Sequence, residues 1–260
     1  MKQIVKVWTN TITKDGQIDE VVLSNVVKGI TENYRVQVST ILVTSGAVGL
    51  GREYLWPNRD PQVDEVTYKQ MCSWAWQAIL MARYKDEFAK HGLKVSQILV
   101  TQDTFANEKN LSSLLKVIEG YLRQGIVPII NENDVLSTEE LEDKELIFPD
   151  NDILAQKIGV LLKVERAIFL SNVAGLFDTH PDNGGSLIRE VTEIDESIYA
   201  MVQDIQSSWG KWWMLSKIRA AKKFMQAGIS LHLADGREKE VLQKVERGEE
   251  VGTIFRKKEK

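Results

Sequence analysis

The stretch that decides the fold is Val127-Pro128-Ile129-Ile130-Asn131-Glu132-Asn133-Asp134, an apolar run that ends abruptly in amides and carboxylates. Two other apolar runs end in the same manner: Val43 leads into Thr44-Ser45-Gly46-Ala47, and Leu170 leads into Ser171-Asn172-Val173-Ala174-Gly175. Short apolar runs bounded by turn signals are typical of buried strands. When such strands are parallel, their carboxyl ends meet at one edge of the sheet, where ligands bind. The three stretches therefore predict a polar site at one edge of a parallel sheet.

Outward from these stretches, short runs rich in β-branched residues alternate with longer segments of helical period. This alternation predicts crossover units and hence an α/β fold, a three-layer α/β/α sandwich around a mainly parallel central sheet. We expect strands at Ile4–Val7, Ser39–Val43, Val95–Val100, Ile126–Ile130, Ala167–Leu170 and Ser230–Ala234. We expect helices at Asp19–Ile30, Tyr68–Lys90, Asn107–Gln124, Asp152–Lys163, Trp213–Ala227 and Glu238–Glu246.

The length and composition favour one compact domain over residues 1–260, because 43% of the residues are apolar, 27% are charged and no tract resembles a linker. A formal net charge of −4 argues against a general attraction to nucleic acid or to an anionic membrane. Cys72 is the only cysteine, and no run approaches the ~20 apolar residues of a membrane span. We therefore expect a cytoplasmic protein that acts on small molecules, with neither nucleic acid nor membrane as a partner.

Polar segments at the expected strand ends each have a functional and a structural interpretation. Lys6 can place a positive charge against a phosphate, or it can be an exposed structural lysine. The glycines and hydroxyls of Thr44–Gly51 let a backbone approach an anion, but they also suit a strand-to-helix turn with a serine cap. The clusters Asn131–Asp134 and Phe148–Asp152 can hold an ammonium group, orient a lysine or bind Mg²⁺ through water, and each can equally cap a helix.

The segment Gly210-Lys211-Trp212-Trp213-Met214-Leu215-Ser216-Lys217 leads into an expected helix. A flexible loop at a helix N-terminus, with a lysine one turn inside, can bind the β- and γ-phosphates of a nucleotide. The two bulky indoles would obstruct that role. Lys217 by itself also suits a solvated lysine on an amphipathic helix.

Taken together, these segments resemble the amino acid kinase superfamily and, within it, the glutamate 5-kinases. The resemblance runs from Ile4 to about Phe255 and so covers nearly the whole chain. The segment Asn131–Asp134 followed by Asp150-Asn151-Asp152 points to the glutamate enzymes rather than to their relatives. The other motifs that carry the resemblance are Val5-Lys6-Val7 with Thr9, Thr44–Ala47, Lys69-Gln70, Pro128-Ile129-Ile130, Gly175-Leu176-Phe177, Met214 with Lys217, and Gly252-Thr253-Ile254-Phe255.

The resemblance implies an ATP-dependent transfer of phosphate to the side-chain carboxylate of L-glutamate, which gives L-glutamyl 5-phosphate, the first step of proline biosynthesis. The implied catalytic residues are Lys6 and Lys217, which would neutralise charge on the transferring phosphoryl group, and Asp152, which would orient the lysines. The residues implied to hold glutamate are Ser45, Gly46, Asp134 and Asn151. Those implied to line the nucleotide site are Lys6, Ser171, Asn172, Lys211, Trp212, Trp213, Met214, Leu215, Ser216 and Lys217.

The implied cosubstrate is ATP with Mg²⁺ bridging its phosphates, and the implied set contains no protein metal ligand. We expect a homo-oligomer. The chain ends soon after Gly252–Phe255, so we expect the kinase domain alone, without the C-terminal RNA-modification-type (PUA) domain that many family members carry.

Seven tryptophans depart from the family pattern. The family has glycine at four of the positions, and glycine is credible at the other three; the four are Trp8, Trp76, Trp212 and Trp213, and the three are Trp56, Trp74 and Trp209. Independent drift would scatter different residues over these sites, and losing glycine costs about 1 kcal/mol or more where a positive φ is required. Our hypothesis is that the gene uses UGA as a glycine codon and was translated with a table that reads UGA as tryptophan.

Two other functions compete with an active glutamate 5-kinase. If the tryptophans are real, the indoles fill the nucleotide site, and the protein is a pseudokinase that serves as a metabolite-binding or interaction module. The chain can also be a sister kinase that acts on N-acetylglutamate, carbamate or a nucleoside monophosphate.

Overall fold

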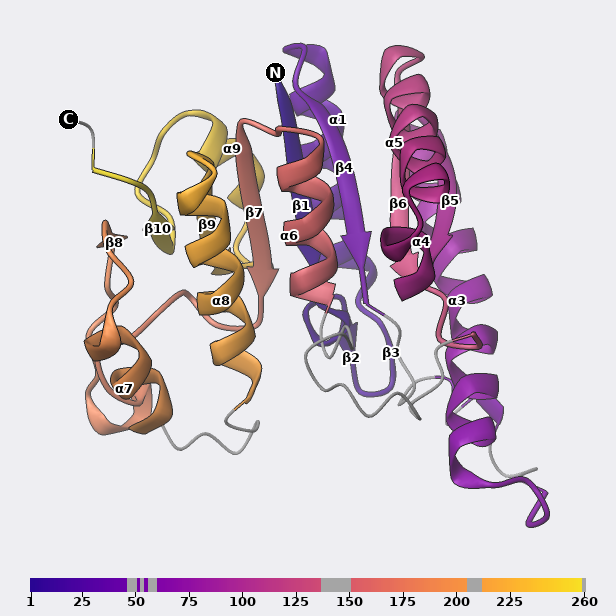
Figure 1. The fold of residues 1–260 in the computed structure, drawn as a ribbon, viewed down its shortest axis with the longest axis horizontal. Coiled ribbons are helices and arrows are strands. Elements are labelled where there is room, and N and C mark those ends of the chain that lie inside the picture. Colours follow the sequence, from indigo (N-terminus) through magenta and orange to yellow (C-terminus); the bar gives the residue numbers. More distant parts are fainter. Residues whose placement is uncertain (46–50, 52–53, 56–59, 137–150, 205–211, 259–260) are drawn as a thin grey trace.

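The computed structural model describes residues 1–45, 51, 54–55, 60–136, 151–204 and 212–258. Within these ranges, one sheet has the strand order β5-β6-β4-β1-β7-β9-β10-β8 (Figure 1). Neighbouring strands are parallel except for β9 and β10, which are antiparallel. The strands are β1 (Lys2–Val7), β4 (Ser39–Thr44), β5 (Lys94–Val100), β6 (Ile126–Glu132), β7 (Arg166–Ser171), β8 (Glu190–Val191), β9 (Ser230–Asp235) and β10 (Thr253–Phe255).

Helices cover both faces of this sheet (Figure 1). α5, α6 and α8 pack on one face, and α1, α3 and α9 pack on the other, each group around its own cluster of buried apolar side chains. This arrangement confirms the predicted three-layer α/β/α sandwich. The helices are α1 (Glu20–Arg35), α3 (Glu65–Lys90), α4 (Gln102–Ala106), α5 (Glu108–Arg123), α6 (Asn151–Leu161), α7 (Glu196–Asp204), α8 (Trp212–Gln226) and α9 (Val241–Glu246).

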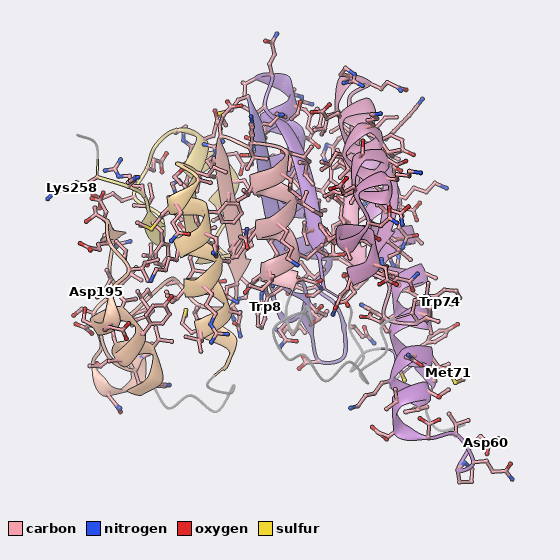
Figure 2. All side chains as sticks on the ribbon, viewed as in Figure 1. Trp8, Asp60, Met71, Trp74, Asp195 and Lys258 are labelled. Atoms are coloured by element: carbon pink, nitrogen blue, oxygen red, sulfur yellow. The ribbon has the colours of Figure 1, made fainter. Side chains whose placement is uncertain are left out.

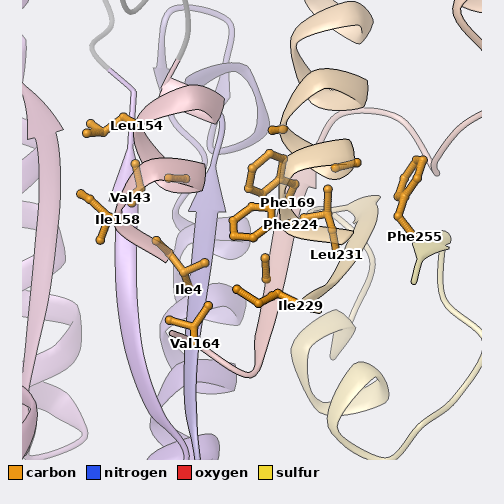
Figure 3. Packing of buried hydrophobic residues seen from close by; sticks show 14 of the residues in the cluster. Ile4, Val43, Leu154, Ile158, Val164, Phe169, Phe224, Ile229, Leu231 and Phe255 are labelled. Atoms are coloured by element: carbon orange, nitrogen blue, oxygen red, sulfur yellow. The ribbon is translucent and has the colours of Figure 1, made fainter. Parts of the chain in front are cut away.

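The strands alternate their apolar side chains between the two layers, as a period of two requires. Ile4 of β1 joins the α5, α6 and α8 side of the core, whereas its neighbour Val5 joins the opposite side. Figure 3 shows the first of these clusters at close range, with Phe169 of β7 against Phe224 of α8. Their ring centroids lie 6.1 Å apart at an interplanar angle of 78°, an edge-to-face contact that aromatic rings favour. The central strands are thus buried on both faces.

A glycine lets α6 and α8 approach each other closely. A Cβ at Gly159 of α6 would lie 2.7 Å from a ring carbon of Phe224, which is closer than carbon atoms pack. The position therefore requires a residue without a side chain if Phe224 is to stay in place. Because α6 and α8 begin at the carboxyl edge of the sheet, their close packing brings the first turns of both helices together.

The six predicted strands and the six predicted helices are all present, with small differences at their ends. Several short elements were not predicted, namely β8, β10, α4, α7 and the small antiparallel pair β2 (Thr13–Lys14) and β3 (Gln17–Ile18). Strands of two or three residues show no period of alternation, and the short helices show too few turns for an apolar stripe to be recognised.

Trp74 and Trp76 both lie inside α3, so neither is at a turn. A glycine within a helix costs about 1 kcal/mol relative to alanine, so the local backbone does not call for glycine there. Trp76 is 5% exposed and belongs to the core, whereas Trp74 is 54% exposed. At Trp8 the backbone has φ −77° and ψ 142°, which any residue adopts, so the cost of replacing glycine at a positive φ does not apply at that position. Trp56 and Trp209 lie outside the described residues.

Candidate active site

The candidate site lies where β1 ends between β4 and β7. Strand β1 has β4 as its neighbour on one side and β7 as its neighbour on the other, and the chain reaches β4 first and β7 later. The carboxyl end of β1 is therefore a topological switch point. In open α/β sheets, ligands bind in the crevice that such a point creates. Figure 2 shows Trp8 at this edge, directly beyond the end of β1. The predicted polar stretches after β4, β6 and β7 do converge on this edge.

Three charged side chains meet there, fully buried. The Lys6 Nζ lies 2.7 Å from Asp152 Oδ1, and the Lys217 Nζ lies 2.8 Å from Asp152 Oδ2. The side chains of Lys6 and Asp152 are 0% exposed and that of Lys217 is 1% exposed, so neither lysine is the solvated structural residue that its sequence context alone allowed. Ser216 on α8 donates a further hydrogen bond of 3.0 Å to Asp152 Oδ2.

The electrostatics of this triad favour an anion. Burial by itself raises the pKa of Asp152, but the charges of Lys217 and Lys6 and their hydrogen bonds outweigh burial and hold that pKa well below its usual range. The carboxylate is therefore ionised at neutral pH. Two ammonium groups face the carboxylate of Asp152, so positive charge is concentrated in a buried site. A phosphoryl group bound between the lysines would be stabilised by both of them.

The indole of Trp8 occupies this position in the structure. Its ring centroid lies 3.6 Å from the Lys217 Nζ and 4.1 Å from the Lys6 Nζ, so both ammonium groups contact the electron-rich face of the ring. The indole N–H also donates a 3.1 Å hydrogen bond to Asp152 Oδ1. Trp8 thus contacts all three members of the triad, and its ring covers the lysines where a phosphoryl group would approach.

On the β4 side, Ser45 is held against the start of the helical turn that follows β1. The Ser45 Oγ accepts a 2.9 Å hydrogen bond from the Thr9 backbone N–H and lies 2.8 Å from the Thr9 Oγ1. Gly51, at the end of the same glycine-rich stretch, lies against α3, since a Cβ there would be 1.9 Å from the Cys72 carbonyl oxygen. Gly46, which the resemblance also assigns to glutamate, lies outside the described residues.

On the β6 side, the predicted substrate residues contact polar side chains of α3. Ser73 donates a hydrogen bond to Asp134 Oδ2. Burial raises the pKa of the Asp134 carboxyl, and the bond from Ser73 partly offsets that rise. Asn131 donates a 2.8 Å hydrogen bond to the Gln77 Oε1 and accepts one of 3.1 Å from the Asn151 Nδ2. Asn151 in turn is the first residue of α6 and immediately precedes Asp152.

On the β7 side, Ser171 is buried at the end of the strand, and its carbonyl accepts from the Gly236 N–H at 2.8 Å. Arg237 donates a 2.6 Å hydrogen bond to the carbonyl of Asn172. Met214 and Leu215, in the first turn of α8, pack partly buried against the core. Lys211 lies outside the described residues, and for Trp212 and Trp213 only the helical backbone is described.

Ser73 and Gln77 are the site residues that the sequence reasoning missed. A signal for them exists, because residues 73, 77, 80, 84 and 88 follow the spacing of a buried helical stripe. Leu80, Tyr84 and Phe88 are its apolar members, so two polar residues that continue the stripe toward the sheet edge are expected to need buried partners.

The described residues contain no group of three His, Cys, Asp or Glu side chains suited to a metal ion. Within the described part of the chain, no helix has both the length and the apolar character that crossing a bilayer demands.

Comparison with known proteins identifies the family of this chain. The amino acid kinase family matches residues 1–235. The chain is 35% identical over 253 residues to the glutamate 5-kinase of Chlorobaculum tepidum, which covers 97% of this chain and 68% of the relative. It is 32% identical over 260 residues to the glutamate 5-kinase of Clostridium acetobutylicum, which covers 99% of this chain and 95% of the relative. A structure of isopentenyl phosphate kinase has the same fold, with a TM-score of 0.65 at 17% identity, over 98% of this chain and 99% of that one. The chain therefore belongs to the amino acid kinase family, within which the relatives named here are glutamate 5-kinases.

Proposed function

We propose that this protein transfers the γ-phosphoryl group of ATP to the side-chain carboxylate of L-glutamate and so forms L-glutamyl 5-phosphate, the first intermediate of proline biosynthesis. The observation that carries the proposal is the buried Lys6–Asp152–Lys217 triad at the switch point of the sheet. Its two buried ammonium groups suit an anionic group in transfer, and phosphoryl transfer depends mainly on positioning and on such electrostatic stabilisation.

In the proposed reaction a carboxylate oxygen of glutamate forms a bond to the γ-phosphorus. The bond from phosphorus to the β,γ-bridging oxygen breaks, and ADP leaves with that electron pair. Lys6 and Lys217 contact the equatorial oxygens of the transferring group, while Asp152 holds both ammonium groups through its two carboxylate oxygens. No residue needs to form a covalent bond to the phosphoryl group.

The two substrates enter from opposite sides of the triad. Glutamate is held on the β4 and β6 side by Ser45, Asp134 and Asn151, and the nucleotide on the β7 and α8 side by Ser171, Asn172 and the segment 211–217. Mg²⁺ usually binds through substrate phosphates and water with one or two carboxylates, rather than in a protein cage. We therefore propose that Mg²⁺, when present, is held mainly by the nucleotide phosphates and would neutralise part of their charge.

Trp8 is the feature that opposes this function, because its ring covers both lysines. This contact is what the pseudokinase alternative requires. We propose instead that residue 8 is glycine in the native protein, through the UGA codon, since the identity to glutamate 5-kinases extends over nearly the whole chain. The exposed Met71 on the projecting helix α3 supports the expected homo-oligomer. The one sheet that runs from β5 to β8 supports a single kinase domain.

The test is a coupled assay of ADP release with Mg-ATP and a panel of acceptors, run on the chain as written and on the Trp8→Gly variant. We expect the glycine variant to use L-glutamate in preference to N-acetylglutamate, carbamate and nucleoside monophosphates. Asp134→Ala is expected to raise the KM for glutamate, whereas Lys217→Ala is expected mainly to lower kcat. Preference for another acceptor would replace the substrate assignment, and unchanged kinetics in both alanine variants would remove the assigned roles.

A further inference from the structure

Helix α3 supports the proposed glutamate site through a chain of three carboxamides. Gln77, which is 6% exposed, accepts a hydrogen bond of 2.8 Å from the Nδ2 of Asn131. The Oδ1 of Asn131, which is 1% exposed, accepts a hydrogen bond of 3.1 Å from the Nδ2 of Asn151. The three groups thus run head to tail from the middle of α3, past the end of β6, to the residue next to Asp152.

This chain has a direction, because a carboxamide has a donor end and an acceptor end. The Gln77 oxygen receives the Asn131 amino group, so the Asn131 oxygen must face Asn151. The side-chain amino group of Asn151 then donates to Asn131, and its side-chain oxygen remains available as an acceptor for another donor. That Asn151 Oδ1 is buried and, among the described residues, has no hydrogen-bond partner. A buried acceptor in this state is costly and calls for a donor.

The neighbouring turn of α3 supports the second proposed substrate residue in the same manner. Ser73 lies four residues before Gln77 and therefore on the same face of the helix. Its hydroxyl donates to Asp134 Oδ2, and the ionised carboxylate of Asp134 has a second oxygen that can act as an acceptor. Both substrate residues thus offer oxygen atoms, which suits a cationic donor such as the α-ammonium group of a free amino acid.

We propose that Gln77 is a positioning residue that fixes the amide orientation of Asn151, so that the site presents an oxygen to the α-ammonium group of the substrate. The inference rests on the proposed function and adds the origin of its preference for a free amino acid. If Gln77 offered no acceptor, Asn131 would be free to turn its amide, and Asn151 would present either end to the substrate. Gln77 itself does not touch the reacting atoms.

The experiment compares L-glutamate with glutarate, which has the same two carboxylates but no ammonium group. Binding of each to the full chain is measured by calorimetry without nucleotide, and KM and kcat are measured in the Trp8→Gly background. Gln77→Met keeps the length of the side chain but removes the acceptor. We expect it to weaken glutamate binding and to raise the KM for glutamate by about tenfold, the loss of one charge-assisted hydrogen bond, with glutarate binding and the KM for ATP unchanged.

Two further variants separate positioning from structure. Gln77→Glu keeps an oxygen toward Asn131 and is expected to hold glutamate within about threefold of the parent protein. Gln243→Met removes a buried glutamine of α9, 7% exposed, and is expected to leave both ligands unchanged. Equal weakening of glutamate and glutarate by Gln77→Met, or no change in either, would overturn the proposal. If the parent protein binds neither L-glutamate nor glutarate, the proposed function is overturned, and with it the positioning role of Gln77.

Discussion

Replacing Trp8 by glycine is expected to uncover the phosphoryl site and to increase activity. The indole contacts both ammonium groups and hydrogen-bonds to the carboxylate between them. A desolvated cation–π contact contributes about 2 kcal/mol, and a hydrogen bond to a charged group about 1.5–3 kcal/mol. A nucleotide phosphate must displace the two cation–π contacts and the hydrogen bond, about 5.5–7 kcal/mol together, before it reaches both lysines.

At about 1.4 kcal/mol for each factor of ten, Trp8→Gly should raise kcat/KM for ATP by about 10⁴- to 10⁵-fold. The assay is glutamate-dependent ADP release at limiting Mg-ATP. Trp8→Ala should match glycine within about threefold, because the backbone at residue 8 has an ordinary negative φ and only the space matters. Trp8→Phe keeps a ring but loses the N–H, so its activity should lie between those of tryptophan and glycine.

A matched control is Trp74→Gly, because Trp74 lies on the exposed side of α3. It should lower the free energy of unfolding by about 1 kcal/mol, the cost of glycine in a helix, without any gain in activity. If folded Trp8→Gly and Trp8→Ala proteins are no more active than the chain as written, the indole does not compete with the phosphoryl group, and the reasoning fails. A gain in Trp74→Gly equal to that in Trp8→Gly would also refute it.

Three other predictions concern pH and the gene. Ser73→Ala removes the hydrogen bond that lowers the pKa of Asp134, so the acid limb of the pH profile of kcat/KM for glutamate should move to higher pH; an unmoved limb would show that Asp134 need not be ionised. Burial, with the charges of Arg166 and Arg256, lowers the pKa of His232 from its ordinary 6.5 to about 4, so the unfolded state binds more protons between these values. Urea unfolding should therefore show stability falling by roughly 2–4 kcal/mol as pH drops from about 6.5 to 4, and His232→Gln should flatten that slope. The coding DNA should carry UGA at Trp8, Trp212 and Trp213; UGG there would exclude recoding.

The sheet and its helices could be predicted because their signals are local. An apolar run such as Val127–Ile130, bounded by polar residues, reads as a strand wherever it lies in the fold, and the longer periodic segments read as helices. The parallel arrangement follows from their alternation, and with it the convergence of the strand ends on one edge. The short strand β10 was missed, and its antiparallel pairing with β9 is set by contacts distant in sequence.

The surroundings of each tryptophan are set by the fold. Trp74 and Trp76, for which the sequence suggested glycine, both lie in a continuous helix, and Trp76 packs in the core. The Trp8 ring lies against the ammonium groups of two lysines, one from β1 and one from α8, and so obstructs the position proposed for the phosphoryl group. Glycine-like backbone strain has no part in it.

The sequence by itself determined which chemical groups the site contains, since Lys6, Asp152 and Lys217 stand next to strand and helix boundaries that can be recognised locally. Only the tertiary structure decided that one carboxylate bridges both lysines, that the Trp8 ring covers them, and that Gln77 orients Asn151 through Asn131. The physical reason is separation along the chain. Hydrogen bonds and ion pairs act over a few ångströms, and the partners here are brought within that range only when α3, α6 and α8 pack on their faces of the sheet.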